Sequence, residues 1–349
     1  LIASTPLSEA NKISGISPNL AYLAKGGYTG DPEWIGAIHE FRVYDKALNP
    51  GEVLYLAQLM PTDPGTENLA HQWTFEDGTT NDSVGGLSGT LVGGAEVVDG
   101  ALVTSAQDQW MEMDGAALAI NTYEAFSIAG WFTPQAGANT GYHMLCYFGD
   151  SLNGFGSNGF FFTPARGNDV SRAGISCGDI AAPWAAETGV DGKETDDGNP
   201  HFVVATIDAT NVSLFMDGEF VGTATLSAAN KISALSTNFA YLAKGGYTGD
   251  PEWIGSIHEF SIYNKALTPG EVLYLANLMP KDPGTDNLTH QWTFDDGTTN
   301  DSVGGLTGTL IGGAAVVDGA LVTSAQDQWM EQIGRASCRE RGSTSGGAR

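Results

Sequence analysis

Residues 255–278, GSIHEFSIYNKALTPGEVLYLANL, are the most informative part of this chain. The first nine residues alternate with a period of two, as a pleated strand requires. This alternation predicts two faces, one with Ile257, Glu259, Ser261 and Tyr263, and the other with His258, Phe260 and Ile262. After a turn, TPGE at 268–271 predicts a helix start with threonine as the N-cap, proline at the first helical position and glutamate completing a capping box. The stretch therefore predicts a strand, a turn and one short capped helix.

This stretch occurs twice, because the chain contains a long internal repeat. Residues 36–59 read GAIHEFRVYDKALNPGEVLYLAQL. They belong to a segment, 11–112, that matches 230–331 at a constant offset of 219 residues (Asn11 to Asn230), with 17 differences in 102 positions. A period of this length indicates an array of whole domains and not a solenoid of small units.

Pro-Gly segments after each capped helix predict linkers and so set the domain boundaries. They place one complete domain at residues 67–279. Residues 1–60 are then the C-terminal part of a preceding repeat, and residues 286–331 are the N-terminal part of a following one. Neither fragment holds a full set of strands. We expect both to be poorly folded alone, unless their first and last strands complement each other.

The last residues differ in character from the rest. From Gln332 the sequence leaves the repeat, and residues 332–349 contain four arginines and one acidic residue. IGRASCRER resembles a translated sequencing-adapter read-through, so we expect this tail to be foreign to the protein. The tail holds Cys338, which leaves Cys146 and Cys177 either to form one disulfide or to remain as two buried thiols.

The composition limits the partners. The 349 residues include 15 Lys+Arg and 41 Asp+Glu, for a net charge of −26. This charge argues against binding to nucleic acid or to anionic membranes, and it suits divalent cations held by carboxylates. The sequence has no apolar run of 18 residues, so we expect no membrane insertion.

Short predicted strands at regular spacing in 67–279, with one terminal helix, favour a two-sheet sandwich or jelly roll. Five motifs follow in order: WTFEDG with a later DS, FSIAGWF, VATID, LFMDG and the closing stretch, at 73–83, 126–132, 204–208, 214–218 and 255–278. Together they resemble the laminin-G-like domains of the concanavalin A-like lectin/glucanase superfamily. The resemblance implies an all-β fold: an antiparallel two-sheet jelly-roll sandwich with one short C-terminal helix per domain, tandemly repeated.

An acidic turn follows the first strand of the complete domain. Hard oxygen ligands gathered in one loop are what Ca²⁺ requires. In this superfamily the opening loop lies near the closing strand, where Asp is common at the position of His258. Because the resemblance places this loop near the closing strand, we predict that Asp77 and Asp82, with Glu259, hold one structural Ca²⁺ that ties the first strand to the last. His258 argues against this site, since a neutral imidazole suits Zn²⁺ better than Ca²⁺. The alternative is a solvated acidic turn.

Two loops carry aromatic residues that suit a sugar ring. KGGYTGDPEW at 244–253 holds Tyr247, Asp250 and Trp253, and a second loop holds Trp184. Exposed aromatic faces beside hydrogen-bonding groups are a usual means of holding sugars. Trp253 also begins the predicted closing strand, and we favour a core position for it. Trp184 is the better stacking candidate.

The sequence offers no catalytic constellation. Glucanases of this superfamily carry E-x-D-x-x-E on a strand, whereas ETDD at 194–197 falls in a glycine-rich loop. We therefore predict a non-catalytic array of carbohydrate-binding or adhesion modules in an exported or cell-surface protein, with a glycan or an extracellular protein as partner. The alternatives are structural spacer domains without a ligand and, third, a glycoside hydrolase of the glucanase type.

Overall fold

The computed structural model describes residues 20–28, 30–166, 170–178 and 182–331. Contacts divide them into two compact units: unit 1 contains Leu54–Lys281, and unit 2 combines residues 20–53 with residues 282–331. The expected foreign tail, 332–349, lies outside the described residues. No helix in the described ranges is long and apolar enough to cross a bilayer.

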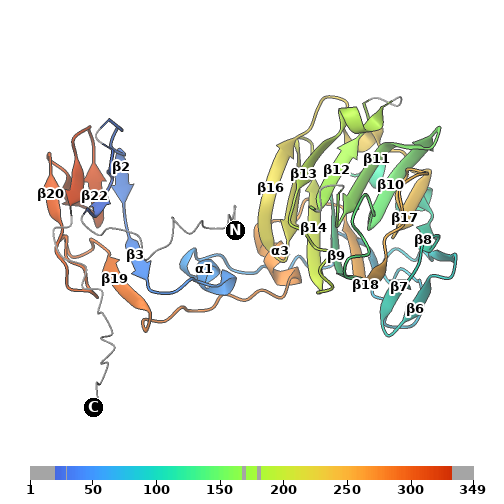
Figure 1. Cartoon of the computed structure of the whole chain (residues 1–349), viewed down its shortest axis with the longest axis horizontal. Helices are drawn as coiled ribbons and strands as arrows, with labels where there is room; N and C mark the ends of the chain where they lie inside the picture. The colour runs from blue at the N-terminus through green and yellow to red at the C-terminus, as the bar shows by residue number, and fades with distance from the viewer. Residues whose placement is uncertain (1–19, 29, 167–169, 179–181, 332–349) are drawn as a thin grey trace, which may run out of the picture. The chain divides into compact units, whose positions relative to one another are not determined.

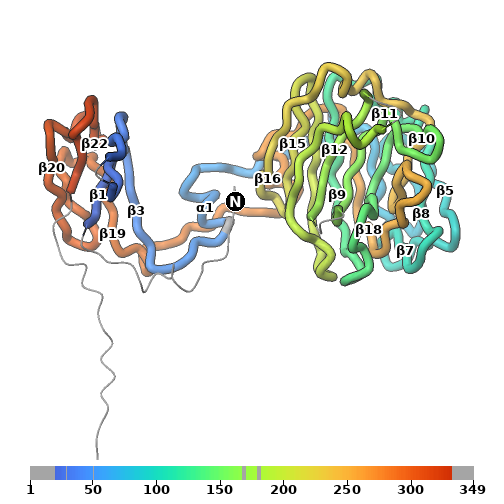
Figure 2. The backbone as a smooth tube through the Cα atoms, turned by 45° about the horizontal axis from the view of Figure 1, so that its top comes forward, coloured from blue at the N-terminus to red at the C-terminus, as the bar shows by residue number. Residues whose placement is uncertain are grey.

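Unit 1 is a β-sandwich of two antiparallel sheets (Figure 1). The seven-stranded sheet has the order β13 (Thr188–Asp191), β12 (Arg172–Ser176), β11 (Phe155–Thr163), β10 (Cys146–Leu152), β17 (Phe239–Leu242), β8 (Trp110–Met113) and β5 (Thr90–Val92). The eight-stranded sheet has the order β16 (Glu219–Thr225), β15 (Asn211–Met216), β14 (His201–Ile207), β9 (Phe126–Pro134), β18 (Gly255–Tyr263), β7 (Ala101–Thr104) and β6 (Glu96–Val98), with β4 (Leu69–Trp73) paired to β18. Strands β9 and β18, far apart in the sequence, run side by side at its centre (Figure 2).

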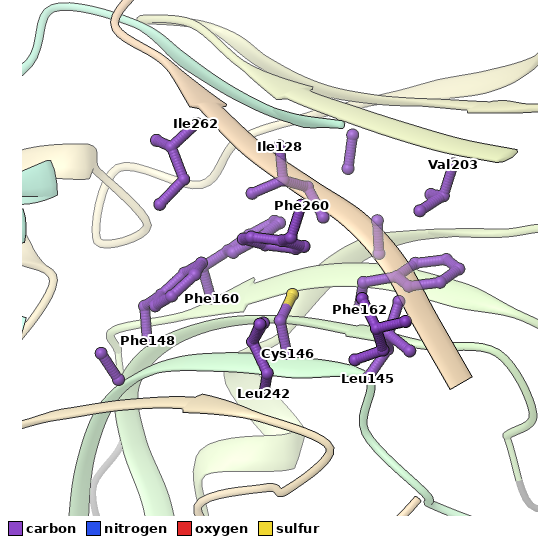
Figure 3. Close-up of a cluster of buried hydrophobic side chains, with 14 of the residues drawn as sticks. Ile128, Leu145, Cys146, Phe148, Phe160, Phe162, Val203, Leu242, Phe260 and Ile262 are labelled. Carbon is purple, nitrogen blue, oxygen red and sulfur yellow. The ribbon is translucent and has the colours of Figure 1, made fainter. Parts of the chain in front are cut away.

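Apolar side chains from both sheets fill the space between them (Figure 3). The eight-stranded sheet contributes Ile128, Val203, Phe260 and Ile262, and the seven-stranded sheet contributes Cys146, Phe148, Phe160, Phe162 and Leu242. Each of these side chains is at most 1% exposed, as close packing of the two sheets requires. Both Cys146 and Cys177 are free thiols, so the disulfide alternative is wrong.

The closing strand β18 departs from the predicted alternation at one point. Its register against β9 shifts between Ile257 and Glu259, which leaves His258 as the extra residue of a β-bulge. The extra residue reverses the alternation, so Ile257 joins Phe260 and Ile262 in the core. The prediction that Ile257 shares a face with Glu259 is therefore wrong, because a strict period of two does not survive a bulge.

The predicted helix is present as α3 (Pro269–Leu275), and its capping box is confirmed between Thr268 and Glu271. Val272 and Ala276 place the helix on the outer face of the eight-stranded sheet, in one buried cluster with Ala129, Phe202, Val204, Phe215 and Tyr263. The remaining helices of unit 1 are single turns: α2 (Gly115–Leu118), η3 (Ile120–Thr122), η4 (Pro183–Ala186) and η5 (Ile232–Ala234).

Unit 2 is built from the two terminal fragments. The N-terminal one supplies β1 (Tyr22–Leu23), β2 (Gly36–Ile38), β3 (Phe41–Tyr44) and the start of α1 (Pro50–Leu56). The C-terminal one supplies β19 (Leu288–Trp292), β20 (Thr309–Ile311), β21 (Ala315–Val317), β22 (Ala320–Thr323) and β23 (Trp329–Glu331). The fragments pair through β1–β23, β2–β22 and β3–β19, all antiparallel. Their small core includes Trp292, Phe294, Leu321 and Met330.

Candidate functional site

Asp82, one of the three carboxylates predicted to bind calcium, is held by protein groups. It is 4% exposed, and Oδ1 accepts the backbone N–H groups of Gln72, Val84 and Gly85 at 2.9, 3.0 and 2.8 Å. Oδ2 lies 2.7 Å from Nδ1 of His71. Burial alone would raise the pKa of Asp82, but these hydrogen bonds outweigh it and lower the pKa. Asp82 therefore fastens the opening turn to β4 through these hydrogen bonds.

The other two carboxylates have separate partners. Asp77 is exposed and accepts hydrogen bonds from the backbone N–H and the hydroxyl of Thr79 at 2.9 and 2.8 Å. Glu259 accepts the side-chain amide of Gln72 at 3.0 Å. Among the described residues, no group of three or more His, Cys, Asp or Glu side chains is arranged to hold a metal ion. The three residues are thus not brought together, and calcium binding stays a prediction that requires Asp82 to exchange protein donors for the ion.

The four residues predicted to bind a ligand separate into one core residue and three site residues. Trp253 is fully buried and meets Phe132 edge-on in the core, with ring centroids 6.1 Å apart. Its interpretation as a core residue is therefore confirmed, and it cannot stack on a sugar. Trp184, by contrast, is 54% exposed. Trp184, Tyr247 and Asp250 lie at the outer face of the seven-stranded sheet.

Aromatic residues form a continuous row across that outer face. Phe161, Tyr147 and Tyr241 stand opposite one another on β11, β10 and β17, and alternate with the core residues of the same strands. Met144 and the partly buried Trp110, Phe239 and Tyr247 pack with them. Such an apolar outer cluster is unusual for a sandwich, whose outward positions are commonly polar. This second layer gives the face a rigid base.

Glycines let the Tyr147 ring lie flat against the sheet. A Cβ atom at Gly159 would stand 2.5 Å from the Tyr147 hydroxyl, so only glycine fits beneath the ring. From above, a Cβ at Gly246 would meet the same ring at 2.4 Å. The Tyr147 hydroxyl donates to the carbonyl of Asp150 at 2.6 Å. Tyr147 is thereby fixed between the sheet and the loop 244–253.

The same loop presents Tyr247 to a chain of exposed rings. Phe155 meets Trp184 edge-on with centroids 5.3 Å apart, and meets Tyr247 edge-on at 6.4 Å. Phe155 is 40% exposed and Tyr142, a neighbour of Tyr247, is 45% exposed. We call Trp184, Phe155, Tyr247 and Tyr142 the aromatic platform. Its spacing suits stacking on the apolar faces of sugar rings.

Asp250 supplies a carboxyl group beside the platform. Its backbone N–H donates to the carbonyl of Tyr247 at 3.3 Å, and its charge helps to raise the pKa of Tyr247 to about 12, where burial is the main cause. Within the described part of the chain, its side chain has no hydrogen-bond or ion-pair partner. Burial raises the pKa of Asp250 to about 6. Such a carboxylate is free to accept hydrogen bonds from a ligand.

An ion-pair network borders the platform. Arg166 and Arg172 both contact Asp191, at 3.0 and 2.7 Å, and Arg172 also pairs with Glu187. Glu187 contributes to the raised pKa of Tyr247, and Tyr142 forms a hydrogen bond with Arg166. Because each arginine is already paired with a carboxylate, the rim offers hydrogen-bonding groups without an excess of positive charge.

The sequence did not predict most of the residues around the platform. No motif marks Phe155, Tyr142 or Glu187. Glu187 directly precedes β13, a strand of only four residues. The sequence held one signal for Phe155: it lies in a strand with alternating residues, β11, just before the glycines of that strand that allow close packing. Only the pairing of β10, β11 and β12 brings these residues to the loop 244–253.

The comparisons with known proteins agree with the motifs. Residues 105–273 match the Laminin_G_3 family, described as the concanavalin A-like lectin/glucanases superfamily, which confirms the resemblance. No curated protein matches the chain.

Several solved structures are similar at low identity. Domain 4 of AbnA, a GH43 extracellular arabinanase from Geobacillus stearothermophilus, in complex with arabinotriose, is 20% identical with a TM-score of 0.44; the alignment covers 60% of this chain and 98% of that one. The Ruminococcus gnavus IT-sialidase CBM40 bound to alpha2,3 sialyllactose is 16% identical with a TM-score of 0.42, over 50% and 96% of the two chains. The receptor binding domain of botulinum neurotoxin C/D mosaic serotype is 12% identical with a TM-score of 0.46, over 61% and 52%.

Proposed function

Because residues 105–273 belong to the concanavalin A-like lectin/glucanase superfamily, we propose that this chain is a non-catalytic glycan-binding module of an exported or cell-surface protein. The finer architecture, a jelly roll repeated in tandem, is part of the same proposal. The observation that carries it is the aromatic platform of Trp184, Phe155, Tyr247 and Tyr142 beside the carboxyl of Asp250, which has no partner among the residues that the structure describes. Repeated modules of this kind gain avidity on a polymeric glycan.

The aromatic platform and the Asp250 carboxyl contribute to binding in different ways, by stacking and by hydrogen bonding. Trp184 and Phe155 are exposed rings whose faces can exclude water from the apolar side of a pyranose or furanose ring. Asp250, and Glu187 on the rim, offer oxygen acceptors for the sugar hydroxyls. Since Arg166 and Arg172 are held by Asp191 and Glu187, this chemistry favours neutral sugars over anionic ones.

Replacing Trp184 by alanine is expected to weaken glycan binding about tenfold or more, which corresponds to about 1.4 kcal/mol. The reason is the loss of the most exposed ring of the platform. A glycan array of the whole chain would first identify the ligand, and calorimetry would then compare the affinities. A chain that binds no glycan would favour the structural-spacer alternative.

Phe220→Ala is the matched control for this experiment. Phe220 is 43% exposed and meets Phe215 edge-on at 5.3 Å, the same distance as between Phe155 and Trp184. This pair lies on the outer face of the eight-stranded sheet, on the other side of the sandwich. Its removal should leave glycan affinity unchanged. Equal losses in both variants would contradict a site at the platform. Release of new reducing ends from the bound glycan would contradict the non-catalytic role.

The affinity for the glycan found on the array is also expected to depend on pH. The pKa of Asp250 is raised to about 6, so the carboxylate is ionised above pH 6 and protonated below it. Since the ionised form is the better acceptor, affinity should fall as the pH is lowered from 7.5 to 5. Asp250→Asn should bind more weakly at pH 7.5 and should lose this dependence. An unchanged pH profile in the variant would rule out the carboxyl as the titrating group.

A further inference from the structure

In both units, strands from the end of a repeat pair with strands from the start of a repeat, and we call this pairing the seam. We define the closing segments as residues 20–56 and 239–275, and the opening segments as residues 67–113 and 286–331. In unit 1, Phe260 stands opposite Trp73 and Ile257 opposite Leu102. In unit 2, the counterparts pair in the same register: Phe41 with Trp292 and Ile38 with Leu321. Both seams even share the register shift near the end of β18 and β3.

The seam of unit 2 joins segments from different repeats. Its closing segment precedes its opening segment by more than 200 residues, yet the pairing is the same as in unit 1. The geometry of the seam therefore does not restrict a closing segment to its own repeat. Because the sandwich has one set of middle strands, β9 to β16, only one of the two closing segments can pair with β9.

The chain connection also permits either segment. The backbone N–H of Thr62 donates to the carbonyl of Gly270 at 2.9 Å, so the linker before β4 lies against the first turn of α3. The counterpart of Gly270 in the first segment is Gly51, only 11 residues before Thr62. A helix of seven residues spans about 10 Å, and the five residues that follow it extend up to about 17 Å. The first segment can therefore occupy the same place and make the same linker contact.

We propose that the backbone of the seam fits either closing segment and that the residue at one buried position selects the second: Ser261 fits there, whereas its counterpart Arg42 keeps the first segment out. This makes the closing seam an interaction surface whose partner is a closing segment from another repeat. The proposal is independent of glycan binding.

The two segments differ at six positions, and five of these differences are mild. The pairs, first segment before second, are Leu20/Phe239, Ala37/Ser256, Arg42/Ser261, Val43/Ile262, Asp45/Asn264 and Asn49/Thr268. Val43 for Ile262 removes one methylene from the core. Asn49 forms the same capping box as Thr268, through hydrogen bonds with Glu52 at 3.0 Å. Positions 45 and 264 are both exposed.

The sixth difference places a charge at a position that is buried in the sandwich. Ser261 is 1% exposed, stands opposite Ala129 and Gln72, and lies on the face that α3 covers. Arg42 in unit 2 keeps its side chain partly exposed and pairs with Glu40 at 2.6 Å. At the position of Ser261, this guanidinium would lose its hydration on a face that α3 covers, and burying such a charge is costly even beside a carboxylate.

Hydrogen exchange by mass spectrometry on the whole chain tests the proposal, because peptides 36–44 and 255–263 differ in mass. In the wild type, β18 is paired on both edges, so 255–263 should be protected and 36–44 should exchange faster. In the reciprocal variant Arg42→Ser/Ser261→Arg, protection should move to 36–44, with about a tenfold change in each segment. Arg42→Ser alone should give two populations for each peptide.

Three outcomes would overturn the proposal. If residues 255–263 remain protected in the reciprocal variant, a position other than 42/261 determines which closing segment pairs with β9. Loss of protection in both segments shows that the first one cannot close the sandwich. A shift in the control Ser261→Ala, which carries no charge, shows that the guanidinium is not the cause. Wild-type behaviour of that control, with the switch in the reciprocal variant, supports the proposal.

Discussion

Phe160→Ala should lower the free energy of unfolding of the sandwich by about 3–5 kcal/mol. Phe160 is fully buried between the sheets and stacks on Phe148 with ring centroids 6.2 Å apart (Figure 3). It also meets Phe126 edge-on at 5.2 Å. Truncation removes the apolar area of the ring and leaves a cavity that these two neighbours cannot fill without moving. Phe160 belongs to the middle strands, of which the chain has one set, so no repeated segment can replace it.

Urea unfolding, followed through the amide exchange of β9, would measure this loss in unit 1 alone. With a slope of about 2–3 kcal/mol per molar urea, the midpoint should fall by about 1–2 M. Phe155→Ala is the matched control, since it lies five residues earlier on the same strand and is 40% exposed. That control should keep the midpoint within about 0.3 M, while it weakens glycan binding. The assignment of the core would be wrong if the two variants lost equal stability.

Asn139→Ala should cost about 3 kcal/mol of unfolding free energy, the second largest loss we expect. Asn139 is fully buried and joins three loops. Its amide nitrogen donates to the carbonyl of Ile254 at 2.8 Å and to Asp196 at 3.1 Å, and its side-chain oxygen accepts the N–H of Ile254 at 2.8 Å. Alanine leaves these buried groups without partners, and an unsatisfied buried group costs about 1–3 kcal/mol.

The same urea experiment measures this variant, with Asn199→Ala as its control. Asn199 is exposed, and its side-chain amide donates to Asp197 at 2.9 Å. Because water can replace that bond, the control should change stability by less than about 0.5 kcal/mol. If Asn139→Ala were equally mild, the loop junction would not depend on its hydrogen bonds.

The outer face of the seven-stranded sheet carries a buried row and an exposed row of aromatic side chains. Its inner row, with Tyr147 against the glycines, is buried and fixes the loop 244–253. Its outer row, the aromatic platform, keeps Trp184, Phe155 and Tyr142 exposed, as the proposed glycan site requires. Variants of Tyr147 would therefore change stability and binding together, whereas variants of Trp184 separate them. This separation makes Trp184 the better probe of function.

The sequence by itself determined the elements with local causes. The capped helix α3 follows from TPGE, because an N-cap, a first-turn proline and a capping-box glutamate act within four residues. The alternation of 255–263 predicted β18, and five ordered motifs predicted the family of residues 105–273. The burial of Trp253 was also predictable from its place at the start of a strand.

Only the tertiary structure decided the features that depend on strands far apart in the chain. Pairing of β18 with β9 creates the bulge that turns Ile257 into the core, and no local pattern announces it. Four hydrogen bonds from β4 and the opening turn hold Asp82, so it anchors this turn in the structure. The platform arises because β10–β13 bring Phe155, Trp184 and Tyr247 together from three separate segments. The physical reason is that side-chain neighbours across a sheet are set by strand order and register, which the local sequence does not encode.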